Sequence, residues 1–134
     1  MTTNLYDLSV GSYTQVLESM VTMLEKGKAH CAENGMATKE LVGSTLNDDM
    51  QNFYFQVASL NHHSAGTIRA LTSGEFGPPM HAFNHAAEDG VYDELLQETK
   101  DSVALMKTQT TDAINALAGQ SITFKMGANE MPFT

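Results

Sequence analysis

The chain has little cysteine, arginine and proline, and these shortages exclude several classes of protein. One cysteine among 134 residues excludes an internal disulfide framework. The single arginine, Arg69, and a formal net charge of −9 leave no basic stripe for nucleic acid. No apolar run reaches the ~20 residues of a membrane helix, and the N-terminus lacks the basic and apolar regions of a signal peptide. We therefore expect an acidic, cytoplasmic protein that binds neither nucleic acid nor membrane.

Scarce proline leaves three long stretches free of helix breakers. Two of the 3 prolines are adjacent, at Pro78 and Pro79. Apolar residues in the three stretches recur at three-, four- and seven-residue steps, which places them on one face of a helix. The spacing predicts long helices over about 9–34, 49–73 and 89–118. Their expected core seams are Tyr13, Leu17, Met20, Leu24 and Cys31; then Met50, Phe53, Val57, Leu60, Ser64, Ile68 and Leu71; then Tyr92, Leu95, Leu96, Thr99, Val103, Met106, Thr110, Ala113 and Leu117.

Short polar residues and glycines mark the expected helix ends. Serine, asparagine and aspartate accept the free N–H groups of a first turn, and glycine suits the left-handed position after a last turn. We expect Ser9 or Ser12 with Gly35 for the first helix, Asn47, Asp48 and Asp49 with Gly74 for the second, and Asp89 with Gly119 for the third.

The connections between the predicted helices are unequal in length. Residues 35–48 include a possible helical turn at Thr38–Val42, whereas 74–88 is an irregular loop. At ~3.3 Å per residue, that loop is long enough to cross a bundle of ~35–40 Å, which lets the second and third helices run parallel. Residues 121–134 are expected to form an extended arm. Three amphipathic helices leave an apolar face open, which a fourth helix or a partner normally covers, so we expect a homodimer.

Three segments carry a resemblance to a known family. LNDDMQNFYFQV (Leu46–Val57), the loop at Pro78 and Pro79, and SITFKMGANEMPFT (Ser121–Thr134) resemble an uncharacterised branch, a domain of unknown function, of the DinB/YfiT-like superfamily. The resemblance covers essentially the whole chain. It implies one domain over residues 1–134 with an all-α, up-down-down-up helical bundle, of which this chain lacks the fourth helix.

The resemblance also implies a divalent-metal site. The better-known DinB-like proteins bind metal through one histidine on the second helix and two on the fourth, and some are thiol transferases or metal-dependent hydrolases. The first ligand position falls near Gln56 here, within about one helical turn. Glutamine is a poor ligand compared with neutral imidazole, and the pair on the fourth helix has no counterpart. The resemblance therefore implies a degraded metal site.

Histidines at other positions are the remaining metal candidates. His62 and His63 are adjacent on the second predicted helix and point about 100° apart, so they do not easily hold one ion together. Relative to the expected seam, His62 points away from the core and His63 lies on its flank. His81 and His85 have the four-residue spacing of two helical ligands, and Glu88 follows three residues later. The cofactor is either a divalent metal such as zinc or nickel, or none.

The remaining chemistry of the sequence is sparse. Cys31 is expected to be a buried core residue, because the C-terminal end of a helix does not lower the pKa of a thiol. No nucleophile elbow, glycine-rich phosphate loop or paired-cysteine zinc motif is present. We therefore expect a binding or structural domain with a degraded metal site. The alternatives are a divalent-metal-dependent enzyme that uses Gln56, His62, His63, His81 and His85, and an interaction module that binds a partner helix or a second copy. No substrate or small-molecule ligand is indicated.

Overall fold

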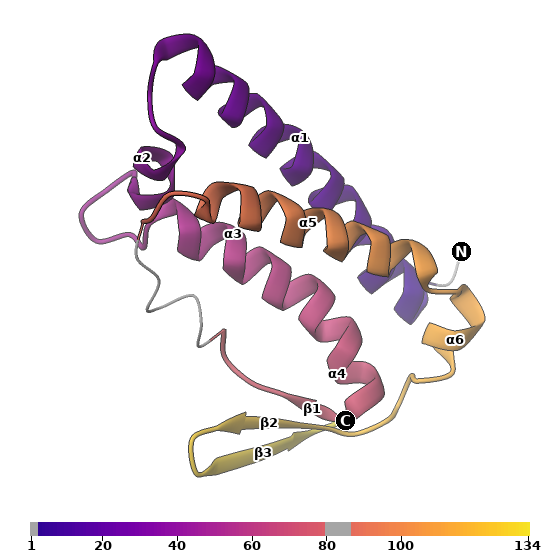
Figure 1. The fold of residues 1–134 in the computed structure, drawn as a ribbon. Coiled ribbons are helices and arrows are strands. Elements are labelled where there is room, and N and C mark those ends of the chain that lie inside the picture. The colour runs from indigo at the N-terminus through magenta and orange to yellow at the C-terminus, as the bar shows by residue number, and fades with distance from the viewer. Residues whose placement is uncertain (1–2, 80–86) are drawn as a thin grey trace.

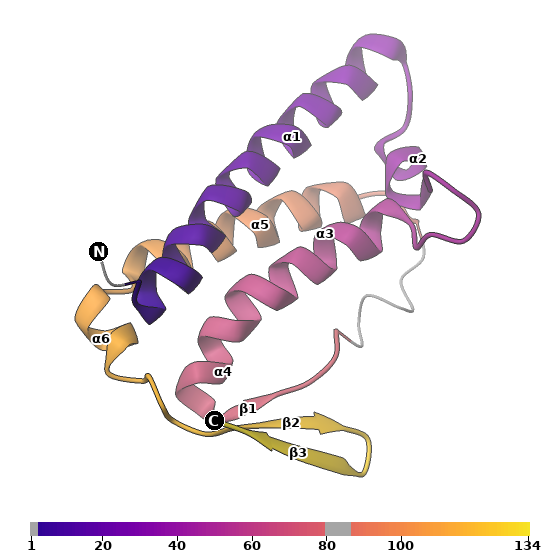
Figure 2. The ribbon, with the colours of Figure 1, turned by 180° about the vertical axis from the view of Figure 1, so that it is seen from behind.

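The computed structural model describes residues 3–79 and 87–134, which form three long helical segments and a small sheet. In Figure 1, the first segment runs in the opposite direction to the other two, which run side by side. The view from behind in Figure 2 shows the same arrangement. The first long segment joins the π-helical turn η1 (Asp7–Gly11) to α1 (Ser12–Asn34). The second joins α3 (Phe53–Asn61), the π-helical turn η2 (His62–Gly66) and α4 (Thr67–Ser73). The third is α5 (Val91–Thr108), and the short helices are α2 (Thr38–Gly43) and α6 (Thr111–Asn115).

The first long helix begins earlier than predicted. The Ser9 hydroxyl donates to the Leu5 carbonyl at 2.6 Å, and the Ser12 hydroxyl donates to the Asp7 carbonyl at 3.2 Å. Both hydroxyls therefore bond to carbonyls of the preceding turn, and the prediction that either serine caps the start is wrong. The predicted end is confirmed, because Gly35 adopts the left-handed conformation with φ 63°.

The second long helix begins at Phe53, four residues later than predicted. Asn52 caps it, since its side-chain oxygen accepts a hydrogen bond from the Phe55 amide at 3.0 Å. The prediction that Asn47, Asp48 and Asp49 cap this helix is wrong, because they lie in the preceding loop, where the Met50 amide donates to the Asn47 carbonyl at 3.0 Å. The predicted end at Gly74 is confirmed, with φ 77°.

The third long helix is shorter than predicted. It ends at Thr108, Gln109 adopts an extended conformation, and the Thr110 side chain caps α6 through the Ala113 amide at 3.3 Å. The break changes which residues face the core. Ile114 is buried, whereas the predicted seam residues Thr110 and Ala113 are exposed.

The core consists of two apolar clusters with buried polar side chains between them along the helices. The Asn61 side-chain amide donates to the Thr99 hydroxyl at 3.0 Å, and that hydroxyl donates to the Leu95 carbonyl at 2.8 Å. Most predicted seam residues are confirmed as core, Cys31 among them. The first cluster contains Leu24, Val42, Tyr54, Val57, Ala58, Val91, Tyr92, Leu95 and Leu96, and the second contains Val10, Leu17, Ala65, Ile68, Met106 and Ile114.

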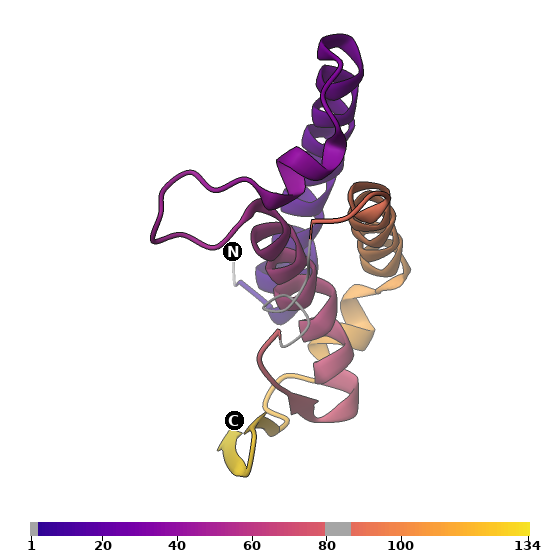
Figure 3. The same cartoon turned by 60° about the vertical axis from the view of Figure 1, so that its left-hand side comes forward.

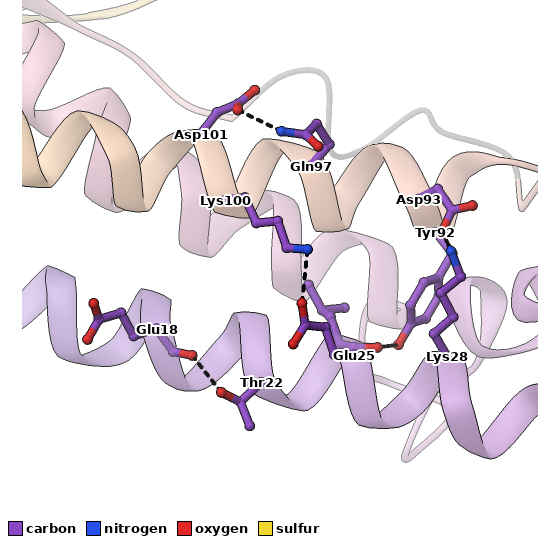
Figure 4. A network of polar contacts seen from close by, with 10 residues as sticks. Glu18, Thr22, Glu25, Lys28, Tyr92, Asp93, Gln97, Lys100 and Asp101 are labelled. Atoms are coloured by element: carbon purple, nitrogen blue, oxygen red, sulfur yellow. Dashed lines mark hydrogen bonds and ion pairs between the residues drawn. The ribbon is translucent and has the colours of Figure 1, made fainter.

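Helices α1 and α5 pack along their length and are tied together by polar contacts (Figure 4). The buried Tyr92 hydroxyl donates to the Leu24 carbonyl at 2.8 Å. A β-carbon added at Gly27 would lie 2.3 Å from that hydroxyl oxygen, so the glycine in the middle of α1 makes room for the tyrosine. Three exposed ion pairs also cross between the two helices: Lys28–Asp93 at 2.6 Å, Lys100–Glu25 at 2.9 Å and Lys107–Glu18 at 2.9 Å.

A three-stranded sheet is present, so the prediction of an all-α fold is too simple. The strands are β1 (Glu75–Phe76), β2 (Ile122–Met126) and β3 (Asn129–Phe133), with β1 parallel to β2 and β2 antiparallel to β3. Part of the predicted irregular loop 74–88 is therefore a strand, and the predicted extended arm is a hairpin. Figure 3 shows this hairpin and the 44–52 loop standing out from the helices.

Side chains alternate across the hairpin, as the register requires. Lys125 pairs with Glu75 at 2.5 Å and with Glu130 at 3.7 Å on one face. The opposite face is apolar and includes Phe76 and Phe124, whose ring centroids lie 6.2 Å apart. The short helix predicted at Thr38–Val42 is confirmed as α2. Within the described ranges, no helix is long and apolar enough to cross a membrane.

Candidate functional site

An apolar groove of about 360 Å³ is bordered by α1, the 44–52 loop and the first turns of α3. Three of its large apolar side chains are exposed, with Met23 46%, Met50 43% and Leu46 93% accessible. Contiguous exposed apolar surface of this kind is typical of an interaction site. The residues that line the groove are Met20, Met23, Ser44, Leu46, Met50, Gln51, Phe53, Gln56 and Val57.

The groove rests on the first apolar cluster of the core. Phe53 lines the groove and stacks on Tyr92, with ring centroids 6.3 Å apart and planes 17° apart. Burial raises the pKa of Tyr92, to which Cys31 and Asp93 contribute further. Burial also raises the pKa of Tyr54 in the same cluster, so both phenols stay protonated at neutral pH. The described residues that line the groove also carry no charged side chain, so its floor is uncharged.

Gln56, the position that the resemblance links to a metal ligand, lies in this groove. Its side-chain amide donates to the Gln51 carbonyl at 3.3 Å. The other polar residues that line the groove are Ser44 and Gln51, so the groove-lining residues described here include no histidine, cysteine or carboxylate. Such a donor set does not fit a divalent metal, which needs imidazole, thiolate or carboxylate ligands.

His62 lies against the sheet instead of pointing into solvent. Its Nε2 lies 2.6 Å from the Gly77 carbonyl oxygen and therefore carries the proton, because a carbonyl only accepts. The His62 ring stacks on Phe76 with centroids 4.8 Å apart. The prediction that His62 points away from the core did not include β1, which folds back over this side of the helix and leaves the side chain half-buried. His63 is exposed, and its ring centroid lies 5.2 Å from that of His62.

The predicted metal candidates do not form one centre in the described part of the chain. His81 and His85 lie outside the described residues. Across residues 3–79 and 87–134, no three histidine, cysteine, aspartate or glutamate side chains come close enough to hold a metal ion. Cys31 is buried, as predicted.

A second pocket, which we call the α4–β pocket, has a volume of about 380 Å³ and lies between α4 and the β1–β2 pair. Sequence reasoning missed it because Arg69 and Lys125 are far apart in the chain. The parallel pairing of Glu75 with Thr123 brings their segments together. A single arginine in an acidic chain was the available signal. The residues that line the pocket are His62, Gly66, Arg69, Ala70, Ser73, Glu75, Phe76, Gly77 and Lys125.

Comparison with known proteins agrees with this architecture. The crystal structure of a DinB family member protein from Shewanella denitrificans matches with a TM-score of 0.66 at 18% sequence identity, and the match covers 95% of this chain and 70% of that one. This likeness establishes a DinB-like fold. No curated protein matches the sequence. The sequence profile described as "Domain of unknown function (DUF1993)" matches residues 5–134, and the chain therefore belongs to the DUF1993 family, an uncharacterised DinB-like branch.

Proposed function

We propose that this chain is a single-domain binding protein of the DinB-like fold that carries out no metal-dependent chemistry, and that it forms a homodimer. The groove between α1 and α3 carries the proposal. It combines exposed Met23, Leu46 and Met50 with an uncharged floor, and Gln56 stands where a metal ligand is expected. Methionine side chains adapt to the surface that they contact, which suits an interface.

A second copy of the chain is the occupant that fits this surface best. Leu46 projects from the 44–52 loop with 93% of its surface exposed, directly beside the hollow that it helps to line. A two-fold axis across the groove places Leu46 of each copy in the hollow of the other, since an isologous interface pairs one patch with itself. Fully burying a leucine side chain stabilises an assembly by about 1.5–3 kcal/mol, and this interface buries two.

The negative net charge of the chain makes association of this dimer depend on salt. Each copy carries a formal charge of −9, so two copies repel one another at long range. The groove itself presents no charged side chain among the described residues that line it. We therefore expect added salt to strengthen association, because salt screens the repulsion between the copies without weakening apolar contact.

Sedimentation velocity over a hundredfold range of protein concentration in the micromolar regime tests the dimer. Leu46→Asp places a charge in the interface and is expected to give a monomer with an unchanged circular dichroism spectrum, because Leu46 makes no contribution to the core. Leu8→Asp is the matched control: Leu8 is 64% exposed on η1, away from the groove, and this variant is expected to dimerise normally. A monomeric wild type, or a dimer that Leu46→Asp leaves unchanged, overturns the assignment of the groove.

Metal analysis of untagged protein tests the other part of the proposal. We expect less than stoichiometric metal after washing with a chelator. Stoichiometric zinc or nickel that survives the wash would overturn the binding-protein assignment in favour of the metal-dependent enzyme, with His62, His63, His81 and His85 as the first residues to substitute.

The up-down-down-up topology is also part of the proposal. Its support is the direction of the long helices, since α1 runs one way while α3–α4 and α5 run the other (Figure 1). The DinB-family neighbour supports the same fold.

A further inference from the structure

We propose that the α4–β pocket binds a small aromatic carboxylate. The pocket shares no lining residue with the groove, so this inference stands independently of the proposed dimer. Its volume of about 380 Å³ falls within the range of small-molecule sites. The pocket combines a cation that has no ion-pair partner among residues 3–79 and 87–134 with aromatic and small apolar walls.

Arg69 is the cation at the pocket that pairs with no carboxylate among the described residues. The chain has 16 acidic and 7 basic residues, so most cations find a carboxylate. Five of the lysines are in ion pairs, whereas Arg69 and Lys26 are in none among the described residues. A guanidinium binds a carboxylate through two parallel N–H···O bonds, which makes an unpaired arginine at a pocket a recognition element for that group.

Lys125 also lines the pocket, and carboxylates of the neighbouring strands hold its ammonium group. Its ammonium group contacts Glu75 at 2.5 Å and Glu130 at 3.7 Å across the neighbouring strands. Glu75 and Glu130 offset the charge of Lys125, so Arg69 is the cation among the described pocket-lining residues that no carboxylate neutralises. A single positive charge matches a monoanionic carboxylate. Inorganic phosphate carries more than one negative charge on average at neutral pH and would be repelled by Glu75 more strongly.

The remaining walls suit an aromatic ring. The stacked rings of His62 and Phe76 form one side, and Gly66 lies next to them. A β-carbon at Gly66 would lie 3.5 Å from His62 Nδ1 and 3.6 Å from Phe76 Cε2, so any larger side chain there would fill the space beside both rings. Ala70 continues this small-residue wall along α4. A planar ligand can therefore lie against the aromatic pair while its carboxylate meets Arg69.

Titration of ¹⁵N-labelled protein with benzoate, followed by NMR, tests the site, and inorganic phosphate serves as the comparison anion. We expect saturable shifts of the Gly66, Arg69 and Gly77 amides with benzoate, and at least about tenfold weaker binding of phosphate. Arg69→Gln is expected to weaken benzoate binding by at least about tenfold. Arg69→Lys is expected to give an intermediate loss, because it keeps the charge but loses the planar fork. Lys26→Gln removes the other unpaired cation and is expected to leave binding unchanged.

Three results overturn the proposal. The first is the absence of saturable shifts at these amides with benzoate. The second is phosphate binding as tight as benzoate binding, which would make the pocket a general anion site. The third is unchanged binding by Arg69→Gln, which would mean that Arg69 does not hold the carboxylate, or an equal loss with Lys26→Gln, which would mean that the net charge of the protein governs the interaction. The Leu46→Asp monomer is expected to bind benzoate as the wild type does, which separates this test from that of the dimer.

Discussion

Replacing Gly27 with alanine tests the packing of α1 against α5. Glycine is a poor helix former, and alanine at an unhindered helical position stabilises a helix by ~1 kcal/mol. At Gly27, however, the new methyl carbon would lie 2.3 Å from the Tyr92 hydroxyl oxygen, far inside normal contact distance. We therefore expect Gly27→Ala to destabilise the protein, in contrast to what helix propensity predicts.

The size of the effect follows from the packing and the hydrogen bond that Tyr92 would lose. Its ring is buried and stacked on Phe53, so it cannot move away without disturbing the core. Overpacking costs about 1–3 kcal/mol, and losing the hydrogen bond from the Tyr92 hydroxyl to the Leu24 carbonyl costs ~1 kcal/mol. After subtraction of the propensity gain, the net loss in the free energy of unfolding is about 1–3 kcal/mol.

Urea denaturation, followed by circular dichroism, measures the change, and Gly11→Ala is the matched control. A β-carbon at Gly11 meets only the Tyr6 carbonyl oxygen, at 3.8 Å, so alanine there is expected to stabilise by about 0.5–1 kcal/mol. In a Tyr92→Phe background the nearest contacts of a methyl group at position 27 become ordinary, at 3.5 and 3.6 Å, and the sign of the Gly27→Ala effect is expected to reverse. Stabilisation by Gly27→Ala in the wild-type background would refute the packing of Tyr92 described above.

Two further predictions concern the start of α3 and the buried tyrosines. Asn52→Ala removes the cap on the Phe55 amide and is expected to lower the free energy of unfolding by ~1 kcal/mol, whereas Asp49→Ala is expected to have almost no effect; urea denaturation distinguishes them. Burial raises the pKa of Tyr54 and Tyr92 above the ordinary value of 10.0, so their contribution to stability is complete below pH 10 and is lost as the pH rises through the folded-state values. The urea concentration at the unfolding midpoint is therefore expected to decrease as the pH is raised above about 10, and to decrease less steeply in Tyr92→Phe. An equally steep decrease in that variant would show that Tyr92 contributes nothing to the pH dependence.

The helices were predictable because their signals are local. Apolar periodicity identified all three long segments, and it placed Leu17, Val57 and Leu95 in the core, where they lie. Gly35 and Gly74 marked helix ends correctly because both adopt the left-handed conformation that ends a helix, which glycine adopts without steric cost. Such signals are contained within a few turns, so they need no knowledge of the rest of the molecule.

The helix starts were less predictable, because several residues of suitable chemistry compete for each cap. The side chains of Asn47, Asp48, Asp49 and Asn52 are all chemically able to accept a backbone N–H hydrogen bond. The structure uses Asn52, where the Phe53 amide also donates to the Ser44 carbonyl at 2.8 Å and closes the loop. That closure depends on α2 and the loop together. The same limit applies at Gln109, where the chain leaves the periodic pattern so that Ile114 reaches the second apolar cluster.

The sequence by itself determined the helical class, the main core residues, the acidic charge and the resemblance to an uncharacterised DinB-like branch, because these depend on composition and short-range spacing. Tertiary structure alone decided the sheet, the two pockets and the environment of His62. The two-residue strand β1 is too short to show a periodic pattern, and it exists only through its pairing with β2. In that pairing Glu75 lies opposite Thr123, which is 48 positions later in the chain. That pairing brings Lys125 to the pocket that Arg69 lines. Contacts between distant segments are decided by which surfaces can be buried together, and no local pattern records that choice.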